Sequence, residues 1–352
     1  MNNTAPRTSK SATDPSCSCL AISMYALLYY LLLQDVETAR HRTKYVLGGA
    51  IPTDIAQRLG ADHLWSPVKK HKQNDVARWV YKIWLKITGS CRFRYLNHTR
   101  IYAQDMGALS VVLGRHHYSM LPDAPNFMTL NMQCNSAEYM RQQRIAHSAR
   151  GRLQTLIFGN IFVHNLGDND QCDTIFLSEE NTSPVLEGKQ VCIHTLEAMW
   201  HDAPDEKRDF VLQVFQVTDD DLRLINSKPV IFFSQALVAD NILTESEYAT
   251  LLSGILSHYD IKEVLIKTHP RDHFDYTRFN PALTVFDKKI NIQLLAFFCN
   301  KVKRVATICS TSVESFPESV QADWFGPGVH PAIERFYGTN YQIHRPHNLM
   351  QL

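Results

Sequence analysis

Short apolar runs alternate with amphipathic stretches along most of the chain, and polar residues follow each run. The clearest run is Val264-Leu265-Ile266, whose apolar and β-branched side chains are typical of a central strand covered on both faces. Pro270 cannot continue a strand ladder, so this strand ends near His269. Comparable runs lie at residues 45–49, 100–105, 118–121, 174–178, 191–193, 230–235, 284–286 and 304–309.

Segments with helical patterns fall between these runs. Thr53 is predicted to cap a helix at 54–59, and Thr244 with Glu247 has the spacing of a capping box. Strand–helix units in this order predict an α/β fold with parallel sheets and right-handed crossovers. Further helices are predicted at 75–88, 106–113, 139–152, 207–217, 244–258 and 292–298.

One of these helices, at 75–88, carries several large apolar residues. Trp79, Ile83 and Ile87 recur at helical spacing. A stripe of this kind predicts a face that is buried in the core.

The N-terminal region combines a polar segment with an apolar one. Residues 1–16 are rich in Ser, Thr, Asn and Pro and are predicted to be disordered. The apolar run at 20–33 is shorter than the ~20 residues that a membrane span needs, and no small-residue cleavage site follows it. We therefore predict a strand at 19–23 and a helix at 24–40, with a membrane anchor as the alternative.

Length and composition indicate two globular domains. A chain of 352 residues exceeds one ordinary core, and 45% of its residues are hydrophobic. We place the link near 225–228, which gives domains at 17–226 and 227–352. The net charge of +1 gives no support to nucleic-acid binding. Eight Cys without a CxxC pair indicate neither zinc nor a redox dithiol, and buried thiols in a reducing compartment are the simplest interpretation.

Candidate chemistry gathers where two predicted strands end. Lys267, His269 and Arg271 follow one strand, and such a cationic turn could hold a phosphate or carboxylate. A solvated loop is the alternative. Ser310 to Ser312 follow another strand, and hydroxyls with free N–H groups at a helix start would form a second anion site.

Several common nucleotide and hydrolase signatures are absent from the sequence. No GxGxxG follows a strand, and neither a Walker lysine motif nor a GxSxG motif occurs. Two parallel-sheet domains with polar turns at their strand ends instead describe the two-Rossmann architecture of many nucleotide-sugar transferases.

An ordered set of motifs resembles a known family. The set comprises residues 267–271, residues 285–288 leading to 294–295, and residues 307–312, with 100–105 and 120–125 in the first half. Together they resemble bacterial glycosyltransferase family 52, the lipooligosaccharide sialyltransferases. The resemblance implies a GT-B-like fold and inverting transfer from CMP-sialic acid without a metal or other cofactor.

The resemblance also implies roles for individual residues. His269 matches the histidine that contacts the donor phosphate, and Ser310 with Thr311 matches a hydroxyl pair near the same phosphate. Asp123 falls on the last acid of an acidic motif, in which Pro122 and Ala124 replace the partner acid and the glycine. The remaining candidates are Lys267, Pro270, Arg271 and Ser312 around the donor, and Asp240 as a second acid.

Inverting transfer needs a carboxylate to take the proton of the acceptor hydroxyl, and charge compensation on the departing phosphate. We expect Asp123 to be this base and Asp240 to support it, with Gln104 and Asp105 facing the acceptor. The donor is expected in a cleft between the two domains.

The expected partners are a nucleotide-sugar donor and a bacterial glycan or glycolipid acceptor, at a cytoplasmic location. Peripheral association with the inner membrane and a homodimer stay open. So do two other functions, a transferase with a different nucleotide sugar and a non-catalytic nucleotide- or sugar-binding protein.

Overall fold

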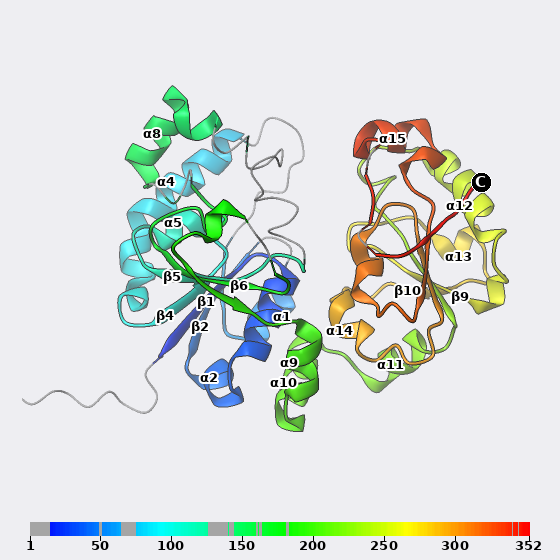
Figure 1. The fold of residues 1–352 in the computed structure, drawn as a ribbon, viewed down its shortest axis with the longest axis horizontal. Coiled ribbons are helices and arrows are strands. Elements are labelled where there is room, and N and C mark those ends of the chain that lie inside the picture. The colour runs from blue at the N-terminus through cyan, green and yellow to red at the C-terminus, as the bar shows by residue number, and fades with distance from the viewer. Residues whose placement is uncertain are drawn as a thin grey trace, which may run out of the picture. The chain divides into compact units, whose positions relative to one another are not determined.

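The computed structural model consists of two compact units, Met1–Val214 and Phe215–Leu352 (Figure 1). Each unit is built around its own parallel sheet, as the sequence predicts. The structure describes residues 15–48, 51–64, 75–125, 140, 144–159, 161, 164–180, 183–339, 341–343 and 345–352.

The sheet of the first unit has the strand order β3-β2-β1-β4-β5-β6-β7, and all its pairs are parallel. Its strands are β1 (Cys17–Ala21), β2 (Thr43–Leu47), β3 (Asp62–His63), β4 (Arg100–Ala103), β5 (Tyr118–Met120), β6 (Cys172–Leu177) and β7 (Gln190–Ile193). Its helices are α1 (Met24–Leu33), α2 (Val36–His41), α3 (Thr53–Arg58), α4 (Asp75–Arg92), α5 (Leu109–Leu113), α8 (Ala149–Phe158), α9 (Leu196–Asp202) and α10 (Asp205–Phe215), with short 3-10 turns η2 (Arg94–Asn97) and η4 (Pro184–Leu186).

Alternating side chains of these strands pack against different helices, because successive residues of a strand face opposite sides. On one face, Tyr30 of α1 lies against the rings of Tyr45 and Tyr102. On the other face, Leu20 and Ile101 join a core with residues of α4, α5 and α8. Helices therefore cover both faces, which explains why the strands read as continuous apolar runs.

The N-terminal apolar run forms a buried strand and helix. β1 and α1 are buried almost throughout. The predicted single helix at 24–40 is wrong in one respect, because the chain breaks at Gln34 and restarts as α2. The Asp35 carboxylate accepts the Thr38 N–H at 2.7 Å and so caps this second helix. Among the described residues, no helix is both long and apolar enough to cross a membrane.

Two further predictions for the first unit need correction. Thr53 does not cap α3; it is the first residue of the helix, and Pro52 at the cap position makes no side-chain hydrogen bond. α4 extends the predicted helix to Arg92, but its apolar stripe is buried only in part: Trp79 packs against the core, whereas Ile83 and Ile87 are 41% and 72% exposed. Residues 139 and 141–143 of the predicted helix at 139–152 lie outside the described residues. Residues 140 and 144–147 are helical as predicted, but the helix is interrupted at Ser148, which caps α8.

The second sheet has the order β10-β9-β8-β11-β12-β13, again with parallel pairs. Its strands are β8 (Val230–Phe233), β9 (Val264–Lys267), β10 (Thr284–Phe286), β11 (Arg304–Thr307), β12 (Gln321–Trp324) and β13 (Asn348–Leu349). Its helices are α11 (Asp219–Ile225), α12 (Glu245–Leu256), α13 (Tyr276–Phe279), α14 (Ile292–Ala296) and α15 (Pro331–Tyr337), with 3-10 turns η5 (Ile261–Glu263), η6 (Thr311–Ser315) and η7 (Pro327–Val329).

Local capping defines α12 and α11. The predicted capping box of α12 is confirmed, with reciprocal bonds between Thr244 and Glu247. The division between the units precedes α11, whereas the sequence indicated a link near 225–228. α11 belongs to the second unit because Ile225 joins its core and Lys288 Nζ donates to Asp221 at 2.5 Å.

Candidate functional site

The strand order of each sheet predicts where a ligand can bind. In the second unit, the chain runs outward from β8 to β9 and β10 on one side, and to β11, β12 and β13 on the other. The first unit has the same arrangement about β1 and β4. In open parallel sheets, ligands bind beyond the carboxyl ends of the strands at this switch point. The candidate residues of both units follow these strands.

The turn after β9 is held by backbone and side-chain hydrogen bonds. The His269 N–H donates to Ser234 Oγ at 3.0 Å, which ties the turn to the end of β8. The Arg271 N–H donates to His269 Nδ1 at 3.2 Å. Because Nδ1 accepts this bond, the neutral imidazole carries its proton on Nε2. Nε2 has no hydrogen-bond partner among the residues that the structure describes, so it can donate to a ligand.

The surroundings of His269 favour this neutral form. Burial lowers the pKa of the imidazole below its ordinary value, and the Arg271 guanidinium lowers the pKa further. Asp272 and Asp240 raise it, without reversing the shift. His269 is therefore a directed N–H donor at neutral pH.

Asp272 anchors the same turn through two side-chain hydrogen bonds. Its carboxylate accepts hydrogen bonds from Ser234 Oγ at 2.5 Å and from Tyr276 Oη at 2.6 Å. Tyr276 in turn shares a 2.8 Å hydrogen bond with the buried Tyr248 hydroxyl of α12. A chain of hydrogen bonds through Asp272 therefore links these core tyrosines to the backbone of His269.

Arg271 and Asp240 form an ion pair across this edge. Asp240 lies in the loop after β8 and its side chain is 28% exposed, while that of Arg271 is 62% exposed. The pair places one predicted acid and one predicted cation together. It also ties the Asp240 carboxylate to the donor-side turn, which favours a supporting role for this residue. Pro270, between His269 and Arg271, is exposed.

Lys267 differs from the other cations because it is buried. It is 5% exposed, its ammonium donates to the Thr268 carbonyl at 2.9 Å, and it lies 5.4 Å from the Phe286 ring centroid. Burial lowers the pKa of this ammonium to about 8, although Asp287 raises it. The structure thus gives Lys267 protein partners rather than a surface position.

The hydroxyl segment after β11 forms a tight turn. The Ser312 N–H donates to Ser310 Oγ at 3.2 Å, and the two hydroxyls are 3.0 Å apart. The predicted helix here is a five-residue 3-10 turn, η6, so it lacks the extended dipole of an α-helix. Thr311 is exposed and Ser310 half-buried, which leaves their hydroxyl oxygens at the strand edge.

Gln235 joins β8 to the β11 turn across the switch point. Its carbonyl oxygen accepts the Cys309 N–H at 2.9 Å, and its amide donates to Tyr337 Oη at 2.9 Å. This bridge fixes the spacing between the β8 end and the Ser310 turn. The donor-side residues therefore lie on three adjacent strands, β9, β8 and β11.

In the first unit, Gln104 and Asp123 meet at the carboxyl edge. The Gln104 amide donates to Asp123 Oδ1 at 2.6 Å. Its carbonyl oxygen accepts the N–H groups of Ile22 and Ser23 at 2.7 and 3.0 Å, where β1 leads into α1. Gln104 is 1% exposed, whereas Asp123 is half-buried. Gln104 thus orients Asp123 and is itself out of reach of solvent.

Asp105 was expected to face the acceptor, but it lies in the interior. It is 1% exposed and accepts hydrogen bonds from the Tyr118 hydroxyl and from the N–H groups of Leu166 and Gly167 at 2.5, 2.7 and 2.8 Å. Burial raises the pKa of this carboxyl, and these bonds oppose the shift. The contacts indicate a structural role, since they hold a loop with positive φ at Leu166 and Gly167.

The structure adds positioning residues that the motifs did not single out. Ser234 and Gln235 directly follow β8. The argument used for His269, that residues after a strand lie at the carboxyl edge of the sheet, could therefore have identified them. Asp272 directly follows the motif at 267–271. Tyr276 and Tyr337 carry no local signal, because their contacts join segments that are distant in the sequence.

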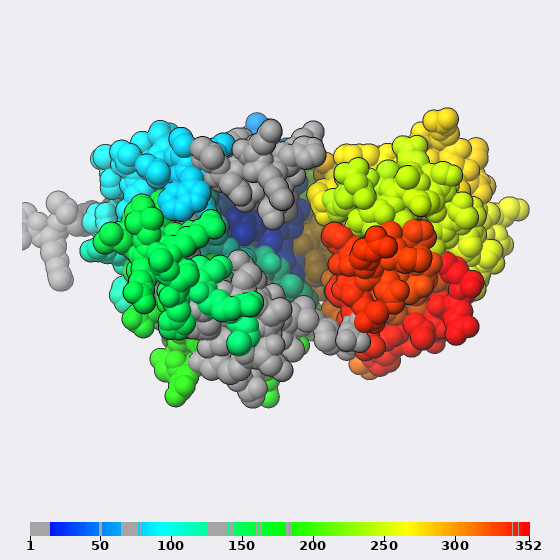
Figure 2. Space-filling view, turned by 90° about the horizontal axis from the view of Figure 1, so that it is seen from above, coloured from blue at the N-terminus to red at the C-terminus, as the bar shows by residue number. Residues whose placement is uncertain are grey.

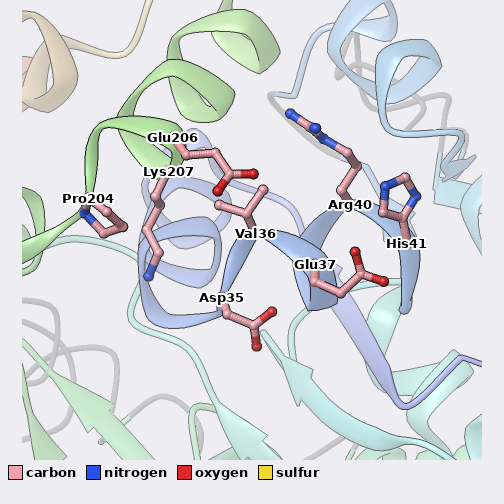
Figure 3. Close-up of a pocket in the computed structure, with 8 residues that line it drawn as sticks. All are labelled: Asp35, Val36, Glu37, Arg40, His41, Pro204, Glu206 and Lys207. Atoms are coloured by element: carbon pink, nitrogen blue, oxygen red, sulfur yellow. The ribbon is translucent and has the colours of Figure 1, made fainter. Parts of the chain in front are cut away.

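A cavity of about 440 Å³ lies elsewhere in the first unit, between α2 and the start of α10 (Figure 3). α2 immediately precedes β2, which places this cavity at the amino edge of the strands, opposite the candidate residues. The cavity is lined by Asp35, Val36, Glu37, Arg40, His41, Pro204, Glu206 and Lys207.

Among the described residues, no group of three or more His, Cys, Asp or Glu could hold a metal ion.

Comparisons with known proteins point to one family. A model of glycosyltransferase family 52 matches residues 127–323. A curated Haemophilus influenzae protein, described as uncharacterized, is 30% identical over 165 residues, which cover 47% of this chain and 54% of that protein. The chain thus matches about half the length of this relative.

A solved structure shares the fold. It is the 2,6-sialyltransferase of Photobacterium sp. JT-ISH-224, in a ternary complex with the donor product CMP and the acceptor substrate lactose. The TM-score is 0.56 with 14% identity, and the match covers 88% of this chain and 71% of that one. The likeness confirms the predicted GT-B-like class of two parallel-sheet α/β domains.

Proposed function

This chain belongs to glycosyltransferase family 52, and from this premise we propose that it is an inverting, metal-independent glycosyltransferase. Its donor is CMP-sialic acid, and its acceptor is a galactose-type hydroxyl of a bacterial lipooligosaccharide or capsule glycan. The Photobacterium enzyme that shares the fold was solved with CMP and lactose, which supports testing this donor and a galactoside acceptor first.

The observation that carries the proposal is the state of His269. Its Nδ1 accepts a backbone N–H, its pKa is lowered, and its Nε2 is free of partners among the described residues. Such an imidazole donates one directed hydrogen bond to a phosphate oxygen. In transfer from CMP-sialic acid, the bond from the anomeric carbon to the phosphate oxygen breaks with its electron pair on the phosphate, so this donor stabilises the leaving group.

The neighbouring groups extend this compensation without a metal ion. Arg271 adds a positive charge beside His269, and Ser310 with Thr311 offers hydroxyls two strands away. Arginine and hydroxyl donors suit phosphate oxygens. These residues all belong to the second unit, which we propose as the donor-binding unit.

Asp123 of the first unit is proposed as the general base. It follows β5 beside the switch point, and Gln104 holds one of its oxygens at 2.6 Å. The other oxygen can accept the proton of the acceptor hydroxyl as that oxygen attacks the anomeric carbon. Its fixed position at a strand end supports this proposed role.

A panel of nucleotide sugars tests the proposal. Purified protein should release CMP from CMP-sialic acid in the presence of lactose and excess EDTA, and should leave UDP-sugars unchanged. Turnover of a UDP-sugar, or activity that returns only when Mg²⁺ or Mn²⁺ is added, would contradict the donor or the metal-independent mechanism.

A second function is favoured by one observation. Pro122 and Ala124 flank Asp123 where the resembled acidic motif has an acid and a glycine. A non-catalytic nucleotide-binding protein would bind CMP tightly and release none from CMP-sialic acid. The same panel, combined with binding measurements, separates this function from the transferase.

A further inference from the structure

Arg345 lies between α15 and β13, and its guanidinium binds the loop that joins β11 to β12. Its Nη1 donates to the carbonyl oxygens of Val313 at 2.7 Å and Phe316 at 2.9 Å. Its Nη2 donates to those of Pro317 at 3.1 Å and Val320 at 2.5 Å. One side chain therefore holds four backbone carbonyls of a single loop.

This loop also carries hydroxyls of the candidate donor site. Ser310 is the cap of the η6 turn, and Thr311 is its first residue. Carbonyl oxygens at the end of a helical turn lack partners within the turn, and an arginine can supply donors to them. Arg345 thus holds the end of the turn whose first residues offer the hydroxyls.

The beginning of the same turn is fixed by the sheet. The Ser310 N–H donates to Thr307 Oγ1 at 3.1 Å, and the Gln235 side chain accepts the Cys309 N–H at 2.9 Å. These bonds attach the turn to β11 and to the end of β8. The turn is therefore held at both ends, by the two strands at its beginning and by Arg345 at its end.

The segment that carries Arg345 is itself attached to the second sheet. β13 pairs with β12, and the Met350 N–H donates to the Trp324 carbonyl at 2.8 Å. Figure 2 shows residues 345–352 in red on the face of the second unit that also carries α15 in orange-red. The guanidinium thus projects from backbone that is already fixed.

We propose that Arg345 is a positioning residue of the donor site, which fixes the η6 turn so that the hydroxyls of Ser310 and Thr311 meet the donor phosphate. The inference rests on the proposed role of these hydroxyls. Donors that are held in place before a ligand binds need no reorganisation when its charge must be stabilised.

The chemistry of the side chain suits this role. A guanidinium is planar and directs N–H groups from two terminal nitrogens in fixed directions. A lysine ammonium is a single point with three donors, so it cannot span the same four carbonyls. The position therefore requires arginine rather than positive charge alone.

Calorimetry with CMP and with cytidine tests the proposal. Cytidine lacks the phosphate, so its affinity reports only the nucleoside contacts. Arg345→Ala should weaken CMP binding about 10-fold, as expected when a hydrogen bond to a charged group is lost, and should leave cytidine binding unchanged. Arg345→Lys should bind CMP with intermediate affinity, and it provides the same comparison if Arg345→Ala does not fold.

Two further measurements examine how Arg345 acts. Thr311→Val removes one exposed hydroxyl, and in an Arg345→Ala background this change should have little further effect on CMP binding. Added guanidinium, at a concentration too low to unfold the protein, should restore CMP affinity to Arg345→Ala. An equal concentration of sodium chloride should not, since sodium cannot donate hydrogen bonds to the carbonyls.

Arg304→Ala provides a matched control for a purely structural arginine. Arg304 is half-buried like Arg345, but it lies at the amino end of β11. Its guanidinium donates to Gln321 Oε1 at 3.1 Å and lies 3.4 Å from Asp323 Oδ2. This variant should lower the melting temperature and leave the affinities for CMP and cytidine unchanged.

The outcomes separate this inference from the proposed function. If the wild type binds CMP no more tightly than cytidine, the proposed phosphate site is wrong and the inference is wrong with it. If the wild type prefers CMP, and a folded Arg345 variant keeps wild-type CMP affinity, only the role of Arg345 is wrong. Equal losses of affinity for CMP and cytidine would assign Arg345 to the stability of the fold alone.

Discussion

Asp123 and Asp240 are both carboxylates that follow strands, but their surroundings differ. Asp123 is held by the neutral amide of Gln104, whereas Asp240 is ion-paired with Arg271. The ion pair ties Asp240 to the donor-side turn, which favours a positioning role. Asp123 contacts a neutral amide rather than a cation, and we propose it as the base.

Asp123→Asn should therefore lower kcat by roughly 10²–10⁴-fold and leave CMP affinity unchanged, because only the proton transfer is lost. Asp240→Asn should mainly weaken CMP binding through its effect on Arg271. Asp173→Asn, an exposed acid of β6, serves as the control and should be silent. Normal turnover in Asp123→Asn with none in Asp240→Asn would reverse the assignment.

Lys267 predicts a stability effect that depends on pH. Burial lowers the pKa of its ammonium to about 8, compared with ~10.4 for lysine in an unfolded chain. Between these two pKa values the unfolded chain binds more protons than the folded chain does. The free energy of unfolding should therefore rise as pH increases from about 8 to about 10, and the gain should be lost as pH falls back to 8.

Lys267→Met removes the buried charge. The variant should be more stable than the wild type at pH 7 by roughly 1–2 kcal/mol, and its advantage should shrink between pH 8 and 10. Urea unfolding of the second unit measures this, with Lys262→Met, at an exposed lysine, as control. An advantage that is absent, or that does not change with pH, would contradict a buried charged Lys267.

At the scale of elements, hydrogen bonds join the ends of β8 and β9. Ser234 Oγ accepts the His269 N–H and donates to Asp272, so it links the strand to the His-Pro turn. Ser234 itself offers no free hydroxyl proton for a ligand. Its effect on donor binding should therefore act through His269.

Ser234→Ala should weaken CMP binding about 3- to 10-fold, as expected for one lost hydrogen bond. In a His269→Ala background, the same change should have little further effect, because residues that act together are not additive. Calorimetry on the four proteins measures the cycle, and Ser257→Ala is a control on the exposed end of α12. If the losses of CMP-binding free energy in the two single variants add fully in the double variant, Ser234 does not act through His269.

At the scale of the whole molecule, the sequence predicts the parallel sheets well and the tertiary contacts poorly. The run at 264–266 and its neighbours are local signals, because a strand buried on both faces must be apolar throughout. Three strands lack such a run and are not predicted from the sequence: β3 and β13 have two residues each, and β12 alternates Gln321 and Asp323 with its apolar residues. The break at Asp35 depends on a cap that the apolar pattern of 20–33 does not reveal.

The candidate site shows the same limit. Position after a strand identified His269, Asp123 and Ser310, since the edge of a parallel sheet can be predicted from strand order. It could not show that Asp105 is enclosed by loop N–H groups, or that Lys267 turns inward toward Phe286. These outcomes depend on segments that are distant in the sequence.

The most direct test of the central claim is calorimetry with CMP in excess EDTA. The wild type should bind CMP in preference to UDP, and His269→Ala should weaken CMP binding about 10- to 100-fold, the loss of one charge-assisted hydrogen bond. His273→Ala, a change at an exposed histidine four residues along the same loop, should bind like the wild type. If folded His269→Ala binds CMP and turns over donor as the wild type does, His269 does not contact the donor phosphate and the proposed site is wrong.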